Sequence, residues 1–188
     1  MVSPSIIVEG KTKLVVAPAD AGKGKRISIL VVGDSLTDAS VYPARLFELV
    51  KGENNPSLKM IGSNGPGWKP QQNGVAHEGW GGWTWGTFLT KTTSHAKKDP
   101  DPWDVPSAFL VVKDGKGKLD VQEYLNKYNN GNAPDFITVQ LGVNDIFGAK
   151  DDNVDSMIEQ IFKNADLLLG EFRRVAPNAV IGVGLVTP

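Results

Sequence analysis

Residues 27–38 read ISILVVGDSLTD, and this stretch decides the fold that the sequence predicts. Its first six residues are apolar except for Ser28. Such a near-continuous apolar run is typical of a strand that is buried on both faces of a parallel sheet. The run breaks at Gly33, and a polar group that includes Ser35 follows it. A serine exposed at the end of a buried strand is either a nucleophile or an ordinary turn residue, and the rest of the chain must decide between the two.

Strands and helices alternate along the chain around this stretch. Apolar runs predict strands at residues 57–63, 135–145 and 179–188, and three- or four-residue spacing predicts helices at 42–52, 120–130 and 153–176. We also expect a short strand at residues 13–18, a long irregular segment at 63–106 and a hairpin at 109–121. This alternation predicts an α/β domain with a mostly parallel sheet, whose ligands bind at the carboxyl ends of the strands.

The chain divides into an extended lead-in, residues 1–25, and one domain, residues 26–188. Its last apolar strand is not followed by a helix, although a parallel sheet needs cover on both faces. We therefore expect this chain to lack the C-terminal strand and helix of the domain, through truncation or cleavage. An edge strand that pairs with a partner is the alternative.

Composition excludes several classes of partner. The sequence is 40% hydrophobic and 22% charged, with a formal net charge of −1, so it lacks the field that attracts nucleic acid or an anionic membrane. No apolar run reaches the roughly 18 residues of a membrane span. The absence of cysteine excludes disulfides and thiolate metal sites, and we expect no metal and no cofactor. The compartment stays open, with a secreted or periplasmic location favoured.

A serine nucleophile needs a base and donors that stabilise the developing oxyanion. Gly33 leaves room for a substrate beside Ser35, and the backbone N–H of Ser35 is one candidate donor. The segment GWGGWT at residues 79–84 supplies glycine N–H groups, and Asn144 supplies a side-chain amide after another apolar strand. The polar clusters GDSLTD at residues 33–38 and GVND at 142–145 both follow apolar strands. They are therefore expected at the same edge of the sheet.

Three segments together resemble one family. VVGDSLTD at residues 31–38, HEGWGGWT at 77–84 and LGVND at 141–145 resemble, in order, the first three sequence blocks of the SGNH (GDSL-type) hydrolases. This resemblance implies a flavodoxin-like, three-layer α/β/α fold and an esterase, lipase, thioesterase or carbohydrate deacetylase activity. It implies Ser35 as the nucleophile, and the Ser35 N–H, the Gly82 N–H and the Asn144 amide as oxyanion donors. Gly82 is preferred to Gly81 as the second donor. The sequence of the second block looks most like that of carbohydrate acetyl esterases.

The chain departs from the family in one respect. The family's base and its orienting acid lie in a C-terminal Asp-x-x-His block, and this chain has no such block. Its two histidines, His77 and His95, both precede Asn144. We expect His77 to be a structural residue bonded to backbone and His95 to be a surface residue. The missing base is expected on a further C-terminal segment or on a separate fragment of the same protein, so the chain alone should be nearly inactive.

The other polar and aromatic residues near these blocks also have two interpretations. Asp34 is expected to bond loop N–H groups, and Asp145 to tie its loop or cap the next segment. Trp80 and Trp83, flanking the glycines, are candidates for a substrate-binding wall, beside Trp85. Aromatic residues also anchor irregular loops to a core, and this role is expected of Trp68 and Trp103.

The sequence therefore predicts a serine esterase that acts on carboxylic esters, with O-acetyl or short acyl groups on carbohydrate as the expected substrate. The alternative is a non-catalytic carbohydrate-binding protein on the same fold. A phosphate- or flavin-binding module ranks below both, because Asp34 and Asp38 would repel phosphate from the GDSLTD loop.

Overall fold

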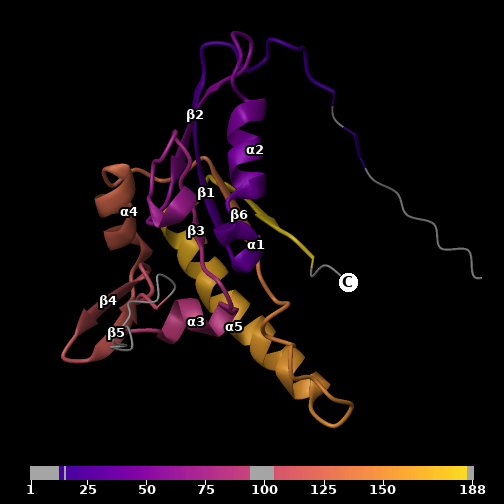
Figure 1. Cartoon of the computed structure of the whole chain (residues 1–188), viewed down its shortest axis with the longest axis vertical. Coiled ribbons are helices and arrows are strands. Elements are labelled where there is room, and N and C mark those ends of the chain that lie inside the picture. The colour runs from indigo at the N-terminus through magenta and orange to yellow at the C-terminus, as the bar shows by residue number, and fades with distance from the viewer. Residues whose placement is uncertain (1–12, 15, 94–103, 186–188) are drawn as a thin grey trace, which may run out of the picture.

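The computed structural model describes residues 13–14, 16–93 and 104–185, and its centre is a parallel sheet (Figure 1). Strands β1 (Arg26–Gly33), β2 (Ser57–Ile61), β6 (Phe136–Gln140) and β7 (Val180–Val183) lie in the order β2-β1-β6-β7. The two-residue strand β3 (Glu78–Gly79) pairs with the carboxyl end of β1, and every pairing in this sheet is parallel. The expected α/β class and mainly parallel sheet are therefore confirmed.

Helices lie on both faces of this sheet. The structure contains α1 (Ser35–Asp38), α2 (Val41–Leu49), α3 (Trp85–Thr90), α4 (Val121–Asn129) and α5 (Val154–Val175), with a 3-10 turn, η1 (Pro66–Trp68). Residues of α2 pack on one face, over a cluster that includes Ile29 and Val31 of β1. Residues of α3, α4 and α5 pack on the other, over a cluster that includes Leu30 and Val32. Alternate residues of β1 thus enter two cores, which explains its continuous apolar run.

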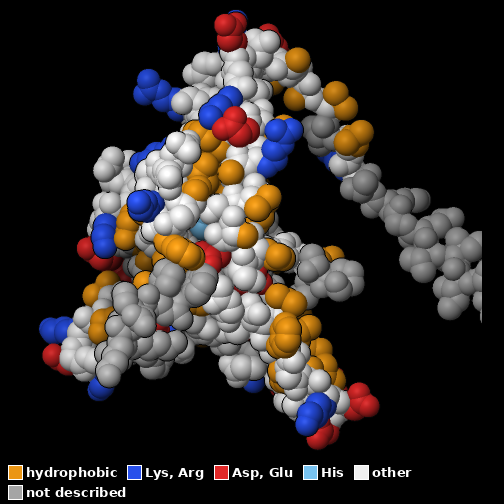
Figure 2. Space-filling view, viewed as in Figure 1, with side chains coloured by type: hydrophobic (Ala, Val, Ile, Leu, Met, Phe, Trp, Pro, Cys, Tyr) orange, Lys and Arg blue, Asp and Glu red, His pale blue; other side chains and the backbone are white. Residues whose placement is uncertain are grey.

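The long helix α5 shows where the core ends. Its buried residues recur at three- and four-residue spacing at Ala165, Leu168, Phe172 and Val175, as the sequence predicts. Toward its N-terminus the helix extends beyond the sheet, and apolar side chains lie along that end (Figures 1 and 2). Phe162 there is 64% exposed, so the apolar stripe of α5 is longer than the core that covers it.

The predicted hairpin and the helix after it are confirmed. Strands β4 (Leu110–Lys113) and β5 (Lys116–Leu119) pair antiparallel, and both turn residues, Asp114 and Gly115, have a positive φ. Two such residues are what a type I′ hairpin turn requires. The carboxylate of Asp120 then accepts from the N–H of Glu123 and caps α4, as expected of this aspartate.

Two expectations were wrong in part. The described residues of 13–18 form no strand, because Leu14 and Val16 are exposed and no neighbouring strand pairs with them. The segment 63–106 is not irregular throughout: it contains η1, β3 and α3, while residues 94–103 lie outside the described ones. Helix α3 begins with a capping box between Thr84 and Thr87, a local signal that propensity alone does not reveal. No helix among the described residues is long and apolar enough to cross a membrane.

Candidate active site

Ser35 lies where β1 ends, as the first residue of α1, and its side chain is exposed. The segment before it is tightly packed: a Cβ on Gly33 or on Gly79 would overlap the side chain of Thr37. This close packing lets β3 run beside the end of β1, where the N–H of Trp80 donates to the carbonyl of Gly33 (3.2 Å). The second block is thereby held next to Ser35.

Asp34 caps the short helix that Ser35 begins. Its side chain is 1% exposed, and its carboxylate accepts from the N–H of Leu36 (3.0 Å). This contact confirms the expected backbone role of Asp34. The carboxylate therefore holds the loop at Ser35 and is buried away from the surface.

The Gly-rich part of the second block forms a tight turn. The N–H of Trp83 donates to the carbonyl of Trp80 (3.2 Å), and Gly82, at the third position, has φ +75°. A type II turn requires this left-handed conformation at that position, and glycine adopts it without strain. In the described part of the chain, neither the N–H of Gly82 nor that of Ser35 donates a hydrogen bond. Both donors therefore remain available to an oxyanion.

The third block is tied to the second by two side chains. The amide of Asn144 donates to the carbonyl of Trp83 (3.1 Å), and the carboxylate of Asp145 accepts from the N–H of Trp85 (3.2 Å). The expected tying role of Asp145 is confirmed. An amide has two N–H donors, so Asn144 keeps one for another acceptor. Burial, and to a lesser extent the charge of Asp34, raises the pKa of Asp145. The first and third blocks follow the paired strands β1 and β6, which brings them close together.

A cavity of about 550 Å³ opens at Ser35. Ser35, Ser40, Pro66, Trp68 and Gly81 are among the residues that line it. Trp68 is 48% exposed, so about half of this residue is left uncovered where it lines the cavity. It also has φ +59°, an uncommon backbone conformation for a bulky residue and one that occurs often at functional sites. The sequence signal for the exposure of Trp68 is its position after Gly65-Pro66-Gly67. This segment has few apolar residues that could bury a large ring.

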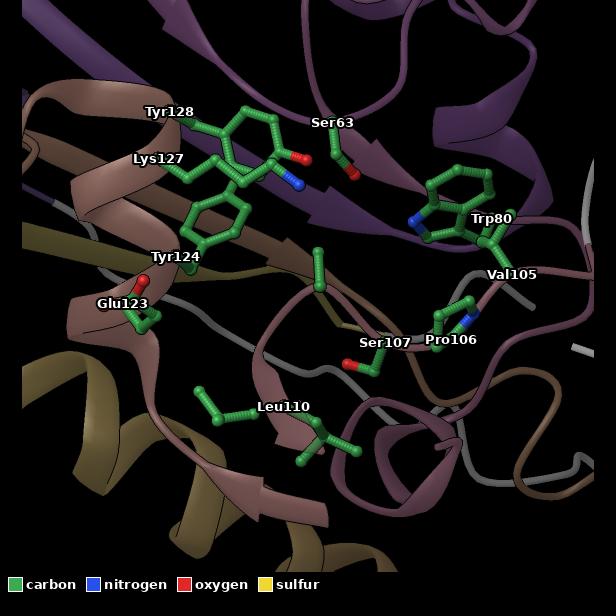
Figure 3. Close-up of a pocket in the computed structure, with 12 residues that line it drawn as sticks. Ser63, Trp80, Val105, Pro106, Ser107, Leu110, Glu123, Tyr124, Lys127 and Tyr128 are labelled. Atoms are coloured by element: carbon green, nitrogen blue, oxygen red, sulfur yellow. The ribbon is translucent and has the colours of Figure 1, made fainter. Parts of the chain in front are cut away.

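Trp80 and Trp83 do not form the expected wall beside Ser35. The two rings stack at 5.6 Å, are 6% and 3% exposed, and belong to the hydrophobic core. Trp83 packs edge-on against Phe88 (4.8 Å). Trp80 borders a second cavity, which it shares with Tyr124 and Ser63 (Figure 3). The two rings are buried because they follow the end of β3, beside a core with enough apolar surface to cover them.

His77 is fully buried and both of its ring nitrogens are engaged. Its Nδ1 accepts from the N–H of Gly79 (3.1 Å), and its Nε2 lies 2.8 Å from the hydroxyl of Ser40. Because Nδ1 accepts, the ring proton is on Nε2 and donates to Ser40, whose hydroxyl donates to the carbonyl of Asp38 (3.1 Å). Burial lowers the pKa of His77 to about 4. The expected structural role of His77 is confirmed. His95 and Trp103 lie outside the described residues.

Glu78 is a buried acid that the sequence reasoning missed. Its carboxylate accepts from the N–H and the hydroxyl of Ser63 and from the indole of Trp80 (3.1 Å). Burial raises its pKa, while these hydrogen bonds lower it. Among the described residues, no group of three or more His, Cys, Asp or Glu side chains is arranged to hold a metal ion. Glu78 therefore belongs to a hydrogen-bond network and not to a cluster of ligands.

Comparisons with known proteins find similarity at the level of solved structures. No family model and no curated protein matches the sequence. A family 3 carbohydrate esterase from Clostridium thermocellum is 22% identical with a TM-score of 0.45, over 85% of this chain and 61% of that one. A family 3 carbohydrate esterase from Talaromyces cellulolyticus is 17% identical (TM-score 0.40, 84% and 60%). A family two carbohydrate esterase from Clostridium thermocellum, in complex with cellohexaose, is 17% identical (TM-score 0.43, 94% and 47%). This chain is thus similar to carbohydrate esterases over less than two thirds of the length of each.

Proposed function

We propose that the protein is a serine esterase of the SGNH type, which hydrolyses O-acetyl or short acyl esters of carbohydrates. One observation carries the proposal. An exposed serine at the end of the central strand lies on a cavity, and the N–H groups of Ser35 and Gly82 nearby have no acceptor of their own within the described residues. Asn144 is tied to the same glycine turn.

The reaction follows from these groups. The Ser35 Oγ attacks the ester carbonyl, a base takes its proton, and the carbonyl oxygen becomes an oxyanion that the Ser35 N–H, the Gly82 N–H and the Asn144 amide stabilise. The carbonyl re-forms as the bond to the leaving oxygen breaks, and the protonated base gives its proton to the departing alcohol. Water then hydrolyses the acyl-enzyme by the same steps. The exposed ring of Trp68 covers the acyl group or its sugar.

The base is not among the residues described at Ser35, since His77 is neutral near pH 7 and engaged on both sides. We place it on a histidine, oriented by an aspartate, in a segment that follows residue 188 or in a separate fragment of the same protein.

The test is hydrolysis of p-nitrophenyl acetate by the protein with that segment present. Ser35→Ala should lower kcat by at least about 10³-fold, because it removes the nucleophile. Ser57→Ala, at an exposed serine of β2, is the matched control and should leave the rate unchanged. Retained activity in Ser35→Ala would overturn the mechanism.

The lack of a base among the described residues also favours the second candidate, a non-catalytic carbohydrate-binding protein. The two differ in what accompanies the chain. Mass spectrometry of the native protein, together with the gene sequence beyond residue 188, should find an Asp-x-x-His segment if the protein is an esterase. Carbohydrate binding without that segment and without turnover would support the binding protein.

A further inference from the structure

Asn64 is a fully buried polar residue that the proposed mechanism does not use. It follows β2, and its backbone pairs with that of His77, which directly precedes β3: each N–H donates to the carbonyl of the other residue (3.0 and 2.9 Å). A buried side-chain amide needs partners for its donors and its acceptor, because an unpaired one costs the desolvation free energy of the group. The partners of Asn64 therefore show which parts of the chain it holds.

The side-chain amide of Asn64 joins three segments of the chain. Its nitrogen donates to the carboxylate of Asp38 (2.9 Å) and to the carbonyl of Gly79 (2.6 Å). Its oxygen accepts from the N–H of Gly65 (2.8 Å). Two of these partners are acceptors and one is a donor, so a reversed amide would lose all three bonds. The surroundings therefore fix the orientation of the amide.

The bond to Asp38 acts on the helix that carries Ser35. Ser35 is the first and Asp38 the last residue of α1, which is a single turn. The N–H of Asp38 donates to the carbonyl of Asp34 (2.9 Å), so this turn is closed by its own hydrogen bond. A displacement of Asp38 is therefore passed to Ser35 across one helical turn, about 5 Å.

The bond to Gly79 acts on the turn that presents Gly82. Gly79 ends β3 and directly precedes that turn. Its N–H donates to the Nδ1 of His77 (3.1 Å) and its carbonyl accepts from Asn64, so both of its backbone polar groups bond side chains. A Cβ on Gly79 would overlap Thr37 of α1, so two of the segments that the amide joins are also packed directly together.

The bond to Gly65 acts on the loop that carries Trp68. The N–H of Trp68 donates to the carbonyl of Gly65 (2.9 Å), so Gly65 closes the turn in which Trp68 lies. Asp38, Trp68 and Gly81 line the cavity of the proposed active site. Each belongs to one of the three segments that the amide joins. Asn64 is therefore a common support of that cavity, although it does not line it.

We propose that Asn64 is a positioning residue, whose amide holds Ser35 and Gly82 at the separation that nucleophilic attack and oxyanion binding require. This role rests on the proposed esterase function and needs no contact with the substrate. Pairing of β1 with β3 aligns the two strands, and the amide continues this connection beyond the strand ends, to α1 and to the glycine turn. A misplacement of about 1 Å can lower a rate by as much as 10²-fold, so such a support matters to turnover.

Asn64→Leu tests this role, because it removes the three hydrogen bonds and keeps a side chain of similar size. In the protein with its base present, kcat for p-nitrophenyl acetate should fall by about 10–10²-fold, while KM stays within about twofold of the parent value. The rates are compared at a temperature at which circular dichroism shows every variant to be folded.

Asn129→Leu is the matched control. Asn129 is 4% exposed, and its amide accepts from the ammonium of Lys59 (2.7 Å) and donates to the carbonyl of Asn132 (2.8 Å). None of these three residues lines the cavity at Ser35. Both leucine variants lose buried hydrogen bonds and should have a lower thermal midpoint than the parent. Only Asn64→Leu should lower kcat, which separates positioning from a general effect on stability.

A second measurement needs no turnover and uses the chain itself. The backbone amide resonances of Ser35 and Gly82 should shift in Asn64→Leu and keep their parent positions in Asn129→Leu. Asn64→Asp is the second variant, to be used if the leucine variant does not fold. It keeps the acceptor for the N–H of Gly65 and loses both donors, so it should shift the same two resonances.

Two results would contradict this role of Asn64. One is a kcat of Asn64→Leu equal to that of Asn129→Leu. The other is unchanged resonances of Ser35 and Gly82 in the Asn64 variants that fold. If the parent protein lacks esterase activity, the proposed function fails, and the resonances still decide whether the amide couples the two segments.

Discussion

The cavities on either side of the Trp80–Gly82 turn are built in different ways. The site proposed at Ser35 depends largely on backbone beside its cavity: the end of β1, the left-handed Gly82 and N–H groups without an acceptor in the described residues. The cavity at Tyr124 is made of side chains, with a buried carboxylate that orders two walls. Features of the first kind depend on where strands end, and features of the second on which distant side chains meet.

Trp68 lines the cavity at Ser35 and Trp80 lines the cavity at Tyr124, so substitutions of these two tryptophans compare the two cavities. Trp80→Ala is expected to lower the free energy of unfolding by about 3–5 kcal/mol, because it leaves a void in the core and removes one of the donors to the buried Glu78 carboxylate. Urea unfolding followed by circular dichroism measures the change. Trp80→Phe keeps most of the packing and should cost clearly less. Equal, small losses in both variants would show that Trp80 is not part of a packed core.

A substitution of Asn144 tests the role proposed for its side-chain amide at Ser35. In the protein with its base present, Asn144→Ala should lower kcat by about 10²–10³-fold, because one oxyanion donor is lost, while KM changes little. Steady-state kinetics with p-nitrophenyl acetate provide the measurement. Asn126→Ala, on the exposed face of α4, is the matched control. A change confined to KM would assign Asn144 to substrate binding instead.

The contribution of His77 to the stability of the fold is expected to depend on pH. Burial lowers the pKa of His77 to about 4, whereas a histidine in an unfolded chain titrates near about 6.5. The unfolded state therefore takes up a proton at a higher pH than the folded state does. The contribution of His77 to stability is complete above about pH 6.5 and is lost as the pH falls toward 4, by up to about 3 kcal/mol.

His77→Gln isolates this effect, because the raised pKa values of Glu78 and Asp145 act in the opposite direction in both chains. Unfolding of parent and variant should be compared at about pH 7 and about pH 4.5 by denaturant titration. The stability gap between the two chains should shrink at the lower pH. A gap that does not change with pH would contradict a neutral, buried His77.

Trp68 is the smallest expected effect on stability and the sharpest contrast with Trp80. Trp68→Ala should lower the free energy of unfolding by clearly less than Trp80→Ala does, because Trp68 is 48% exposed and Trp80 is 6% exposed. With the intact esterase, KM for an acylated sugar should rise severalfold while kcat for p-nitrophenyl acetate stays similar. A loss of stability as large as that of Trp80→Ala would return Trp68 to the role of a loop anchor.

The predictable part of the fold is the part whose signal is local. The apolar run of 27–32 needs only its own composition to indicate a buried strand, and the 153–176 periodicity needs only its spacing. The lead-in at 13–18 shows the limit of this reasoning. The residues around Leu14 and Val16 have the composition of a strand, but no other strand lies beside them in the structure. A strand is stabilised by pairing with a neighbour, which this segment lacks.

The candidate site was predictable where it depends on strand ends. Ser35, Gly82 and Asn144 follow strands or turns, so the parallel order of the sheet is enough to expect them at one edge, and the structure places their segments there. Glu78 was not predicted. Its partners, Ser63 and Trp80, become a network only when β3 lies beside β1.

By itself, then, the sequence determined the class of fold, the order of the main strands and helices, and the three segments that meet at one edge of the sheet. Those features depend on neighbours a few residues away. The tertiary structure alone decided which tryptophan is buried and which is exposed, that both nitrogens of His77 are engaged, and that Tyr124 faces a cavity. These features depend on contacts between residues far apart in the chain. The residues next to a tryptophan in a Gly-rich loop do not indicate whether its ring will be buried or exposed.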